Sequence, residues 1–160
     1  MGKIEIRRRI RLWDSEDKIG LIIGSISHKP LYTLQGGHSP ERKARDIYQP
    51  LFDRFQVDFV LHGHSHNMQR THPLKYGGLD NDPIIASNGL DFGSDHGQIY
   101  IVNGAGGHEL GKFDEPNNKW TPFAYDLGYG YNVLKFRGKS VEVLAKSING
   151  DILDSFTVTK

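Results

Sequence analysis

Two short apolar segments, each leading to a histidine, place the strongest constraint on the fold. Residues 19–27 end directly before His28, and residues 57–62 end at His62 and lead into Gly63-His64. Both segments are short, rich in branched aliphatic residues and bounded by turn-forming residues, so we expect two buried strands rather than helices. The loop that follows each strand therefore begins beside a histidine.

A helix is predicted between these strands, because apolar residues recur there at spacings of three and four. The residues on this predicted apolar face are Ala44, Ile47, Tyr48, Leu51, Phe52 and Phe55. Ser39 is the expected N-cap and Pro40 the first helical residue, whereas Pro50 should bend or split the helix. Two strand, loop and helix units in succession predict a sheet with a ligand site at its strand ends.

The C-terminal part of the chain is dominated by strand patterns. The predicted strands are residues 83–87, 98–104, 131–136, 140–146 and 152–159. Residues 137–139 and 149–151 are hairpin turns, so the last three strands form a β-meander. Residues 104–130 are rich in glycine and proline and are expected to form a long loop. The predicted fold class is α/β, with a β-rich part after residue 80.

Composition limits the chemistry to histidine and carboxylate groups. The chain has 160 residues, no cysteine and a formal net charge of +1. It fits one domain and excludes thiolate zinc sites and cysteine nucleophiles. The charge gives no general attraction to nucleic acid or membrane, and the basic cluster at residues 7–11 is interpreted as a solvated face. The chain contains neither a signal-peptide core nor a membrane-length apolar run, so we expect a soluble protein of unknown localisation.

The stretch Gly63-His64-Ser65-His66 is the principal metal-binding candidate. In an extended loop, side chains two residues apart share a face, so both imidazoles can meet one ion or two neighbouring ions. Imidazole is a common ligand for zinc, iron and manganese. The alternative is that these are solvent-exposed loop histidines. His28, at the end of the other predicted strand, favours the metal site.

Several stretches together resemble a known enzyme family. They are SHKPLYTLQGGHSP (residues 27–40), IYQPLFDRFQVDFVLHGHSHNMQRTHPL (47–74), IYIVNGAGGHEL (99–110) and the segment 129–158. In this order they resemble the C-terminal half of a calcineurin-like metallophosphoesterase, closest to the purple acid phosphatase branch. The resemblance implies a β-sandwich flanked by helices, with residues 19–160 forming the C-terminal part of the phosphoesterase domain. Residues 1–18 are a charged leader without a match.

The resemblance also implies site residues and a reaction. By analogy, His28 and His64 bind one metal ion, His66 binds the other, and His38 faces the substrate phosphate and protonates the leaving group. The metals expected from the family are iron, zinc or manganese in a dinuclear centre. The implied reaction is hydrolysis of a phosphoester by a metal-bound hydroxide that attacks phosphorus.

The chain departs from the family in its carboxylates. The Asp-x-His, Gly-Asp-x-x-Asp and Gly-Asn-His elements that complete the family's metal centre do not occur in it. Neutral imidazoles alone do not offset the repulsion between two close divalent ions. We therefore expect weak metal binding and little or no turnover from this chain alone. The alternative is a non-catalytic truncated module that associates with the missing N-terminal half, or with itself, through exposed strand edges.

The remaining candidates receive minor roles. The usual aromatic-Glu-Arg sequence of the branch is replaced by residues 68–70, Met-Gln-Arg, for which only packing is expected. His62 is predicted to pack inside the protein, and His72 and His96 to be loop or turn residues. His108 is a minor candidate for substrate contact. Asn103 and the glycine-rich run of residues 104–107 are expected to support the histidine loop (residues 63–67) from behind, and Asp58 is expected to be solvated at a strand edge.

Overall fold

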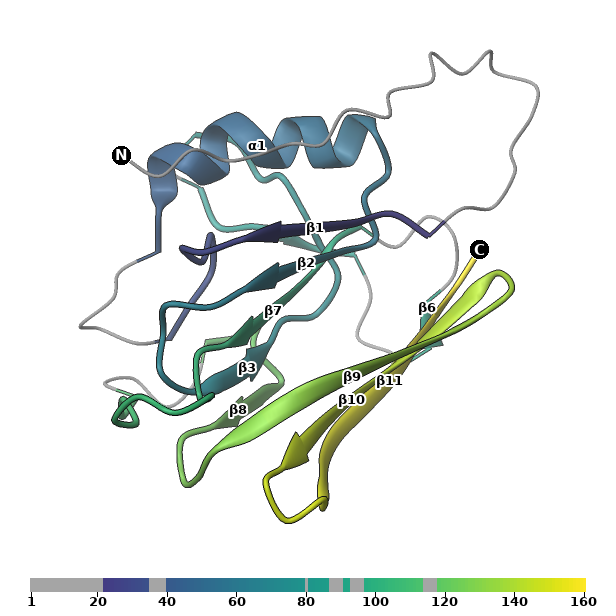
Figure 1. Ribbon diagram of the computed structural model, residues 1–160. Helices are drawn as coiled ribbons and strands as arrows, with labels where there is room; N and C mark the ends of the chain where they lie inside the picture. Colours follow the sequence, from purple (N-terminus) through teal and green to yellow (C-terminus); the bar gives the residue numbers. More distant parts are fainter. Residues whose placement is uncertain (1–21, 35–39, 80, 87–90, 93–96, 114–117) are drawn as a thin grey trace.

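The computed structural model describes residues 22–34, 40–79, 81–86, 91–92, 97–113 and 118–160. Within this part, a five-stranded sheet has the order β1-β2-β7-β3-β8 and a four-stranded sheet the order β6-β11-β10-β9. A third, two-stranded sheet pairs β4 with β5. Helix α1 lies on one side of the five-stranded sheet and strands β9 to β11 lie on the other (Figure 1). This layered α/β arrangement confirms the predicted fold class.

The parallel centre of the first sheet consists of β1 (Gly24–Ser27), β2 (Phe59–His62) and β7 (Ile99–Asn103). Strand β2 pairs in parallel with both neighbours, and Ser27 of β1 lies opposite His62. Strand β1 is an exposed edge, with Ile26 76% accessible. The prediction that this first segment is a buried strand was therefore wrong over its described residues; residues 19–21 lie outside the described part.

Alternation along β2 and β7 builds two hydrophobic cores. Phe59, Ile99 and Ile101 face the second sheet and pack with residues of β10 and β11. Val60 and Tyr100 face the opposite side and pack beneath α1. Because consecutive strand residues point to opposite faces, one apolar strand serves both layers.

Helix α1 spans Arg42–Arg54 and runs continuously through Pro50. Of the two predicted effects of this proline, a bend or a split, the split was therefore wrong. Glu41, rather than Ser39, is the N-cap, so Pro40 lies outside the helix. The buried face of the helix also differs from the predicted apolar face. Ala44, Tyr48 and Phe52 of that predicted face pack on the core, and its three other residues are exposed. The polar residues Arg45 and Gln49 are buried instead. The exposed members are Ile47, Leu51 and Phe55.

The C-terminal meander is confirmed as predicted. Strands β9 (Gly130–Arg137), β10 (Ser140–Ser147) and β11 (Ile152–Thr159) pair in antiparallel order. Gly138 and Gly150 have φ values of 57° and 94° in the two turns, a backbone region that glycine adopts without strain.

Short strands complete the sheets. Sequence periodicity did not identify β3 (Met68–Arg70), β4 (Leu74–Lys75), β6 (Asp91–Phe92) or β8 (Phe123–Tyr125), since each spans only two or three residues. Strand β5 (Ile84–Ile85) lies within a predicted strand. Strand β3 pairs in antiparallel fashion with β7 and β8, so the chain returns from the histidine loop directly into the sheet.

Asp58 is a correction to the sequence-based prediction. Its side chain is only 1% exposed and pairs with Lys160 Nζ at 2.9 Å, while its other carboxylate oxygen accepts a hydrogen bond from the Ile23 amide at 2.7 Å. Asp58 therefore fixes the entrance to β1 and the C-terminal residue, and is not solvated at a strand edge.

Candidate functional site

Two parallel strand ends bring His28 and His64 together. His28 follows β1, and His64 follows β2 after the single residue Gly63. The Gly63 amide donates to the His28 carbonyl at 3.1 Å, which ties the two loops where they begin. His64 has a φ of 64°, an uncommon conformation for a residue with a side chain. Strained backbone of this kind is often found at functional sites.

The two imidazoles meet at a spacing that suits a metal ion. His64 Nδ1 lies 3.1 Å from His28 Nε2, and the rings are arranged edge to face. Two imidazole nitrogens bound to one ion at ~2.0–2.1 Å, with tetrahedral or octahedral angles, lie roughly 2.8 to 3.4 Å apart. The pair therefore fits two positions of one coordination sphere. It equally forms an N–H···N hydrogen bond, with one ring donating.

His66 belongs to a second pair. Its ring centroid lies 4.2 Å from that of His108, which stands on the exposed loop after β7. The Gly111 amide donates to the His66 carbonyl and joins the same two loops. Within the described residues, no three His, Asp or Glu side chains form a group able to hold a metal ion. The donor set thus fits an ion only in part, because no third His, Asp or Glu side chain of the described residues completes a group around the two imidazoles.

The predicted site residues are therefore only partly assembled. The structure brings His28 to His64, as the two strand ends predicted, but gives no shared ligand group that includes His66. His38 and His96 lie outside the described residues. His108 was predicted only as a minor candidate for substrate contact. Its contact with His66 was missed, and the only sequence signal for it was the run of glycines before His108.

The histidine loop is supported from behind by the segment after β7, as predicted. The Gly104 amide donates to the Asn67 carbonyl, and a Cβ at Gly104 would lie 2.2 Å from the Ser65 carbonyl oxygen. Real Cβ atoms do not approach backbone so closely, so glycine is required at this position. Ser65 and Asn67 are both fully buried, which gives the loop a fixed inner side.

His62 packs inside the protein, as predicted. Its Nδ1 lies 2.8 Å from Ser27 Oγ, its ring stacks on Tyr100, and its Nε2 is buried without a hydrogen-bond partner. Burial lowers the pKa of His62 to about 4, and its contact with Ser27 opposes that shift only in part. His62 is thus a neutral residue that links the ends of β1 and β2 at neutral pH.

This lowered pKa predicts acid sensitivity. The unfolded chain binds a proton at His62 near pH 6.5, whereas the folded chain binds it only near pH 4. The stability contribution is therefore complete above pH 6.5 and is lost as the pH falls from 6.5 to 4. Between pH 7.5 and pH 5, the free energy of unfolding should fall by about 2 kcal/mol on this account. Urea unfolding of the wild type and of His62→Gln at both pH values measures this fall in the free energy of unfolding. If the two proteins show an equal pH dependence, the loss of stability does not come from His62.

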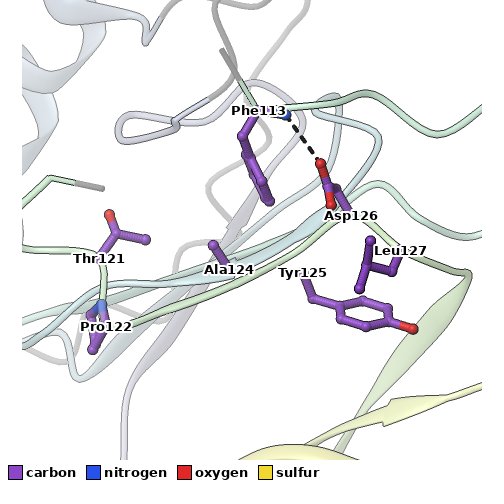
Figure 2. Close-up of a pocket in the computed structure, with 7 residues that line it drawn as sticks. All are labelled: Phe113, Thr121, Pro122, Ala124, Tyr125, Asp126 and Leu127. Atoms are coloured by element: carbon purple, nitrogen blue, oxygen red, sulfur yellow. Dashed lines mark hydrogen bonds between the residues drawn. The ribbon is translucent and has the colours of Figure 1, made fainter. Parts of the chain in front are cut away.

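A surface depression is lined by none of the four paired histidines. It has a volume of about 450 Å³ along β8 and the adjoining loop. Figure 2 shows its lining, with Asp126 accepting a hydrogen bond from the Phe113 amide at 3.3 Å. None of the predicted site residues lines it, although Phe113 belongs to the same segment after β7 as His108. Its size alone is therefore no reason to place chemistry there.

Comparison with known proteins identifies the relatives of this chain. Residues 97–155 match the family described as "Iron/zinc purple acid phosphatase-like protein C". A "Nucleotide pyrophosphatase/phosphodiesterase" of Hordeum vulgare is 33% identical over 79% of this chain and 33% of its own length. A "Probable inactive purple acid phosphatase 27" of Arabidopsis thaliana is 32% identical over 78% of this chain and 20% of its own length. The chain thus spans a third or less of these relatives.

A solved structure agrees with this result. The purple acid phosphatase isolated from yellow lupin (Lupinus luteus) seeds superimposes with a TM-score of 0.76 and 26% sequence identity. The match covers 86% of this chain and 25% of that protein. Among the residues that the structure describes, there is also no helix with the length and apolar character needed to cross a membrane.

Proposed function

Because this chain carries the C-terminal region of a purple acid phosphatase-like metallophosphoesterase, we propose that it supplies the histidine side of a metal-dependent phosphoester hydrolase site. The observation that carries the proposal is the 3.1 Å pair of imidazole nitrogens at the ends of two parallel strands. A phosphatase-type function agrees with the purple acid phosphatase-like family that the chain matches. The matching region is proposed to be residues 19–160, with residues 1–18 as a separate leader.

Each histidine has a proposed role. His28 and His64 hold one ion, and His66 holds a second, with iron, zinc or manganese as the metals. Bound ions would neutralise the oxygens of a phosphoester and lower the pKa of water at the site. His38 would donate the proton that the leaving oxygen needs. His62, being buried and neutral, keeps the two ligand loops in place without taking part in proton transfer.

Carboxylate ligands must come from elsewhere for this site to be complete. Catalytic zinc sites commonly use three protein ligands, and two close metal ions need bridging anions to offset their repulsion. The described residues place two imidazoles at ligand spacing, and no carboxylate among them completes a group of three ligands with this pair. We propose that the remaining ligands belong to another part of the polypeptide or to another chain. This chain alone then binds metal weakly and turns over little or no substrate.

An activity assay tests this directly. Purified chain with added zinc, iron or manganese should hydrolyse p-nitrophenyl phosphate no faster than the metal salt alone. The matched sample is His64→Ala, in which one imidazole of the 3.1 Å pair is removed. Metal-dependent turnover that disappears in His64→Ala would contradict the proposal of an incomplete site, although it would support the metal role of His64.

A second candidate function is association with another polypeptide without catalysis. Strand β1 pairs only with β2 among the described strands, and its Ile26 is 76% exposed. An edge strand of this kind offers free backbone groups to a partner strand. Size-exclusion chromatography with and without zinc or manganese separates the two candidates. A metal-independent oligomer that His64→Ala leaves intact would favour association, whereas a monomer that binds metal favours the hydrolase.

A further inference from the structure

One buried amide, that of Gln69 on β3, bonds to two separate segments near the histidine loop. Its Oε1 accepts a hydrogen bond from the Leu34 amide at 2.8 Å. Its Nε2 donates to Thr33 Oγ1 at 3.0 Å and to Asn67 Oδ1 at 2.7 Å. The side chain is almost completely buried, with 3% of Gln69 exposed. Both donors and the carbonyl oxygen of this amide are therefore used inside the protein.

The contacts continue from these partners to a third loop. Thr33 Oγ1 also lies 3.0 Å from Ser65 Oγ, in the middle of the Gly63–Asn67 histidine loop. Asn67 Nδ2 donates to the Gly111 carbonyl at 3.3 Å. Gly111 lies three residues after His108, and its amide donates to the His66 carbonyl at 2.9 Å. Three loops that carry candidate histidines thus meet around one glutamine.

The chemistry of the network requires an amide at residue 69. A carboxylate accepts from the Leu34 amide but places a second acceptor against Asn67 Oδ1. Asn67 cannot turn its own amide over without losing donation to Gly111. A leucine of similar volume leaves buried donors and acceptors without partners. The Met-Gln-Arg sequence, a departure from the branch's aromatic-Glu-Arg, is therefore matched to Asn67 in this chain.

We propose that Gln69 is a positioning residue that fixes three loops relative to one another: the loop after β1, the histidine loop and the loop after β7. The part of this inference that concerns metal ligands rests on the proposed function; the part that concerns loop order does not. The prediction that residues 68–70 have only a packing role therefore missed the hydrogen bonds of Gln69 to other segments.

Hydrogen–deuterium exchange of backbone amides, resolved by NMR, tests the proposal without any metal. In Gln69→Leu, the amides of Leu34 and Gly111 should exchange about tenfold faster. In Gln69→Glu, Leu34 should keep its protection because its acceptor remains, while Gly111 should exchange faster. This split between two segments distinguishes positioning from general destabilisation, which raises exchange everywhere.

The matched control is Gln98→Leu. Gln98 is also a buried amide, 2% exposed, but it donates to Asp53 of α1 instead of to the loops. Its replacement should leave the amides of Leu34 and Gly111 protected from exchange.

If Gln69→Leu does not fold, Gln69→Glu and Thr33→Val carry the test. Thr33→Val keeps the side-chain volume and should speed exchange at the Leu34 amide. Unchanged exchange at Leu34 and Gly111 in the Gln69 variants, or equal changes in Gln98→Leu, would overturn the proposal.

A zinc titration separates this inference from the proposed function. If the wild type binds zinc, Gln69→Leu should bind it about tenfold more weakly, as expected when groups that orient ligands are lost. Equal zinc affinity in the two proteins would overturn the ligand-positioning role. A wild type without zinc affinity would overturn the metal roles of His28 and His64 instead, and the exchange experiment would still decide whether Gln69 orders the loops.

Discussion

Arg70→Ala should lower the free energy of unfolding by about 3 to 5 kcal/mol, because it removes a buried guanidinium and leaves the Asp154 carboxylate, whose side chain is only 15% exposed, without its partner. Arg70 Nε lies 2.5 Å from Asp154 Oδ2, and Arg70 Nη2 lies 3.0 Å from Asp154 Oδ1. The guanidinium also lies 5.2 Å from the Phe156 ring centroid. Strand β3 of the first sheet is thereby joined to β11 of the second. Urea unfolding measures the loss.

Two controls show whether the unpaired charge causes this loss. The double variant Arg70→Met, Asp154→Leu should recover most of the stability, because two apolar residues replace both charges. Lys135→Ala breaks an exposed ion pair with Glu142 on the second sheet and should cost less than about 1 kcal/mol. A double variant as unstable as Arg70→Ala would show that packing, rather than the carboxylate, causes the loss.

Asp58→Ala should have an effect of similar size, about 3 to 5 kcal/mol, because Lys160 would keep a buried ammonium without its partner. The Lys160 side chain is 9% exposed, and its Nζ lies 2.9 Å from Asp58. The Ile23 amide would also lose its acceptor directly before β1. Urea unfolding measures the total loss, and hydrogen exchange should be faster along β1, which ends beside His28.

Asp58→Asn is the matched variant. Its side-chain oxygen can still accept from Ile23, so β1 should keep more of its protection than in Asp58→Ala, although the ion pair with Lys160 is lost. Adding Lys160→Met to Asp58→Ala should restore part of the stability by removing the unpaired charge. If Asp58→Ala is as stable as the wild type, the buried ion pair does not stabilise the fold.

Strand alternation allowed much of this fold to be predicted. The meander from β9 to β11 and the strands β2 and β7 follow from apolar patterns over several residues, which local sequence reports well. The parallel pairing of β1 with β2 also followed from the helix between them. These elements were sufficient to predict that His28 and His64 lie near each other.

Features that depend on distant contacts were not predictable in this way. Asp58 is buried because Lys160, far along the chain, reaches it, and no local pattern reveals such a partner. Helix α1 buries Arg45 and Gln49 because polar groups in the core pair with them, for example the Tyr32 hydroxyl with Gln49. Periodicity counts apolar residues only, so it assigned Ile47, Leu51 and Phe55 to the core, although these three side chains are exposed.

The sequence predicted which histidines lie near the candidate site better than it predicted how their side chains are arranged. His62 was correctly separated from its neighbours because strand alternation turns it inward. The pairing of His66 with His108 depends on how two loops pack together, which the sequence does not encode locally. The same is true of Gln69, whose partners lie on other segments.

Calorimetric titration of the chain with zinc tests the central claim most directly. The claim is that His28 and His64 form one ligand pair, so the wild type should bind zinc weakly, and either His28→Ala or His64→Ala should weaken it by about tenfold or more. His72→Ala is the control, since His72 belongs to neither histidine pair, and its affinity should match the wild type. Zinc affinity that is unchanged in both His28→Ala and His64→Ala would contradict the account.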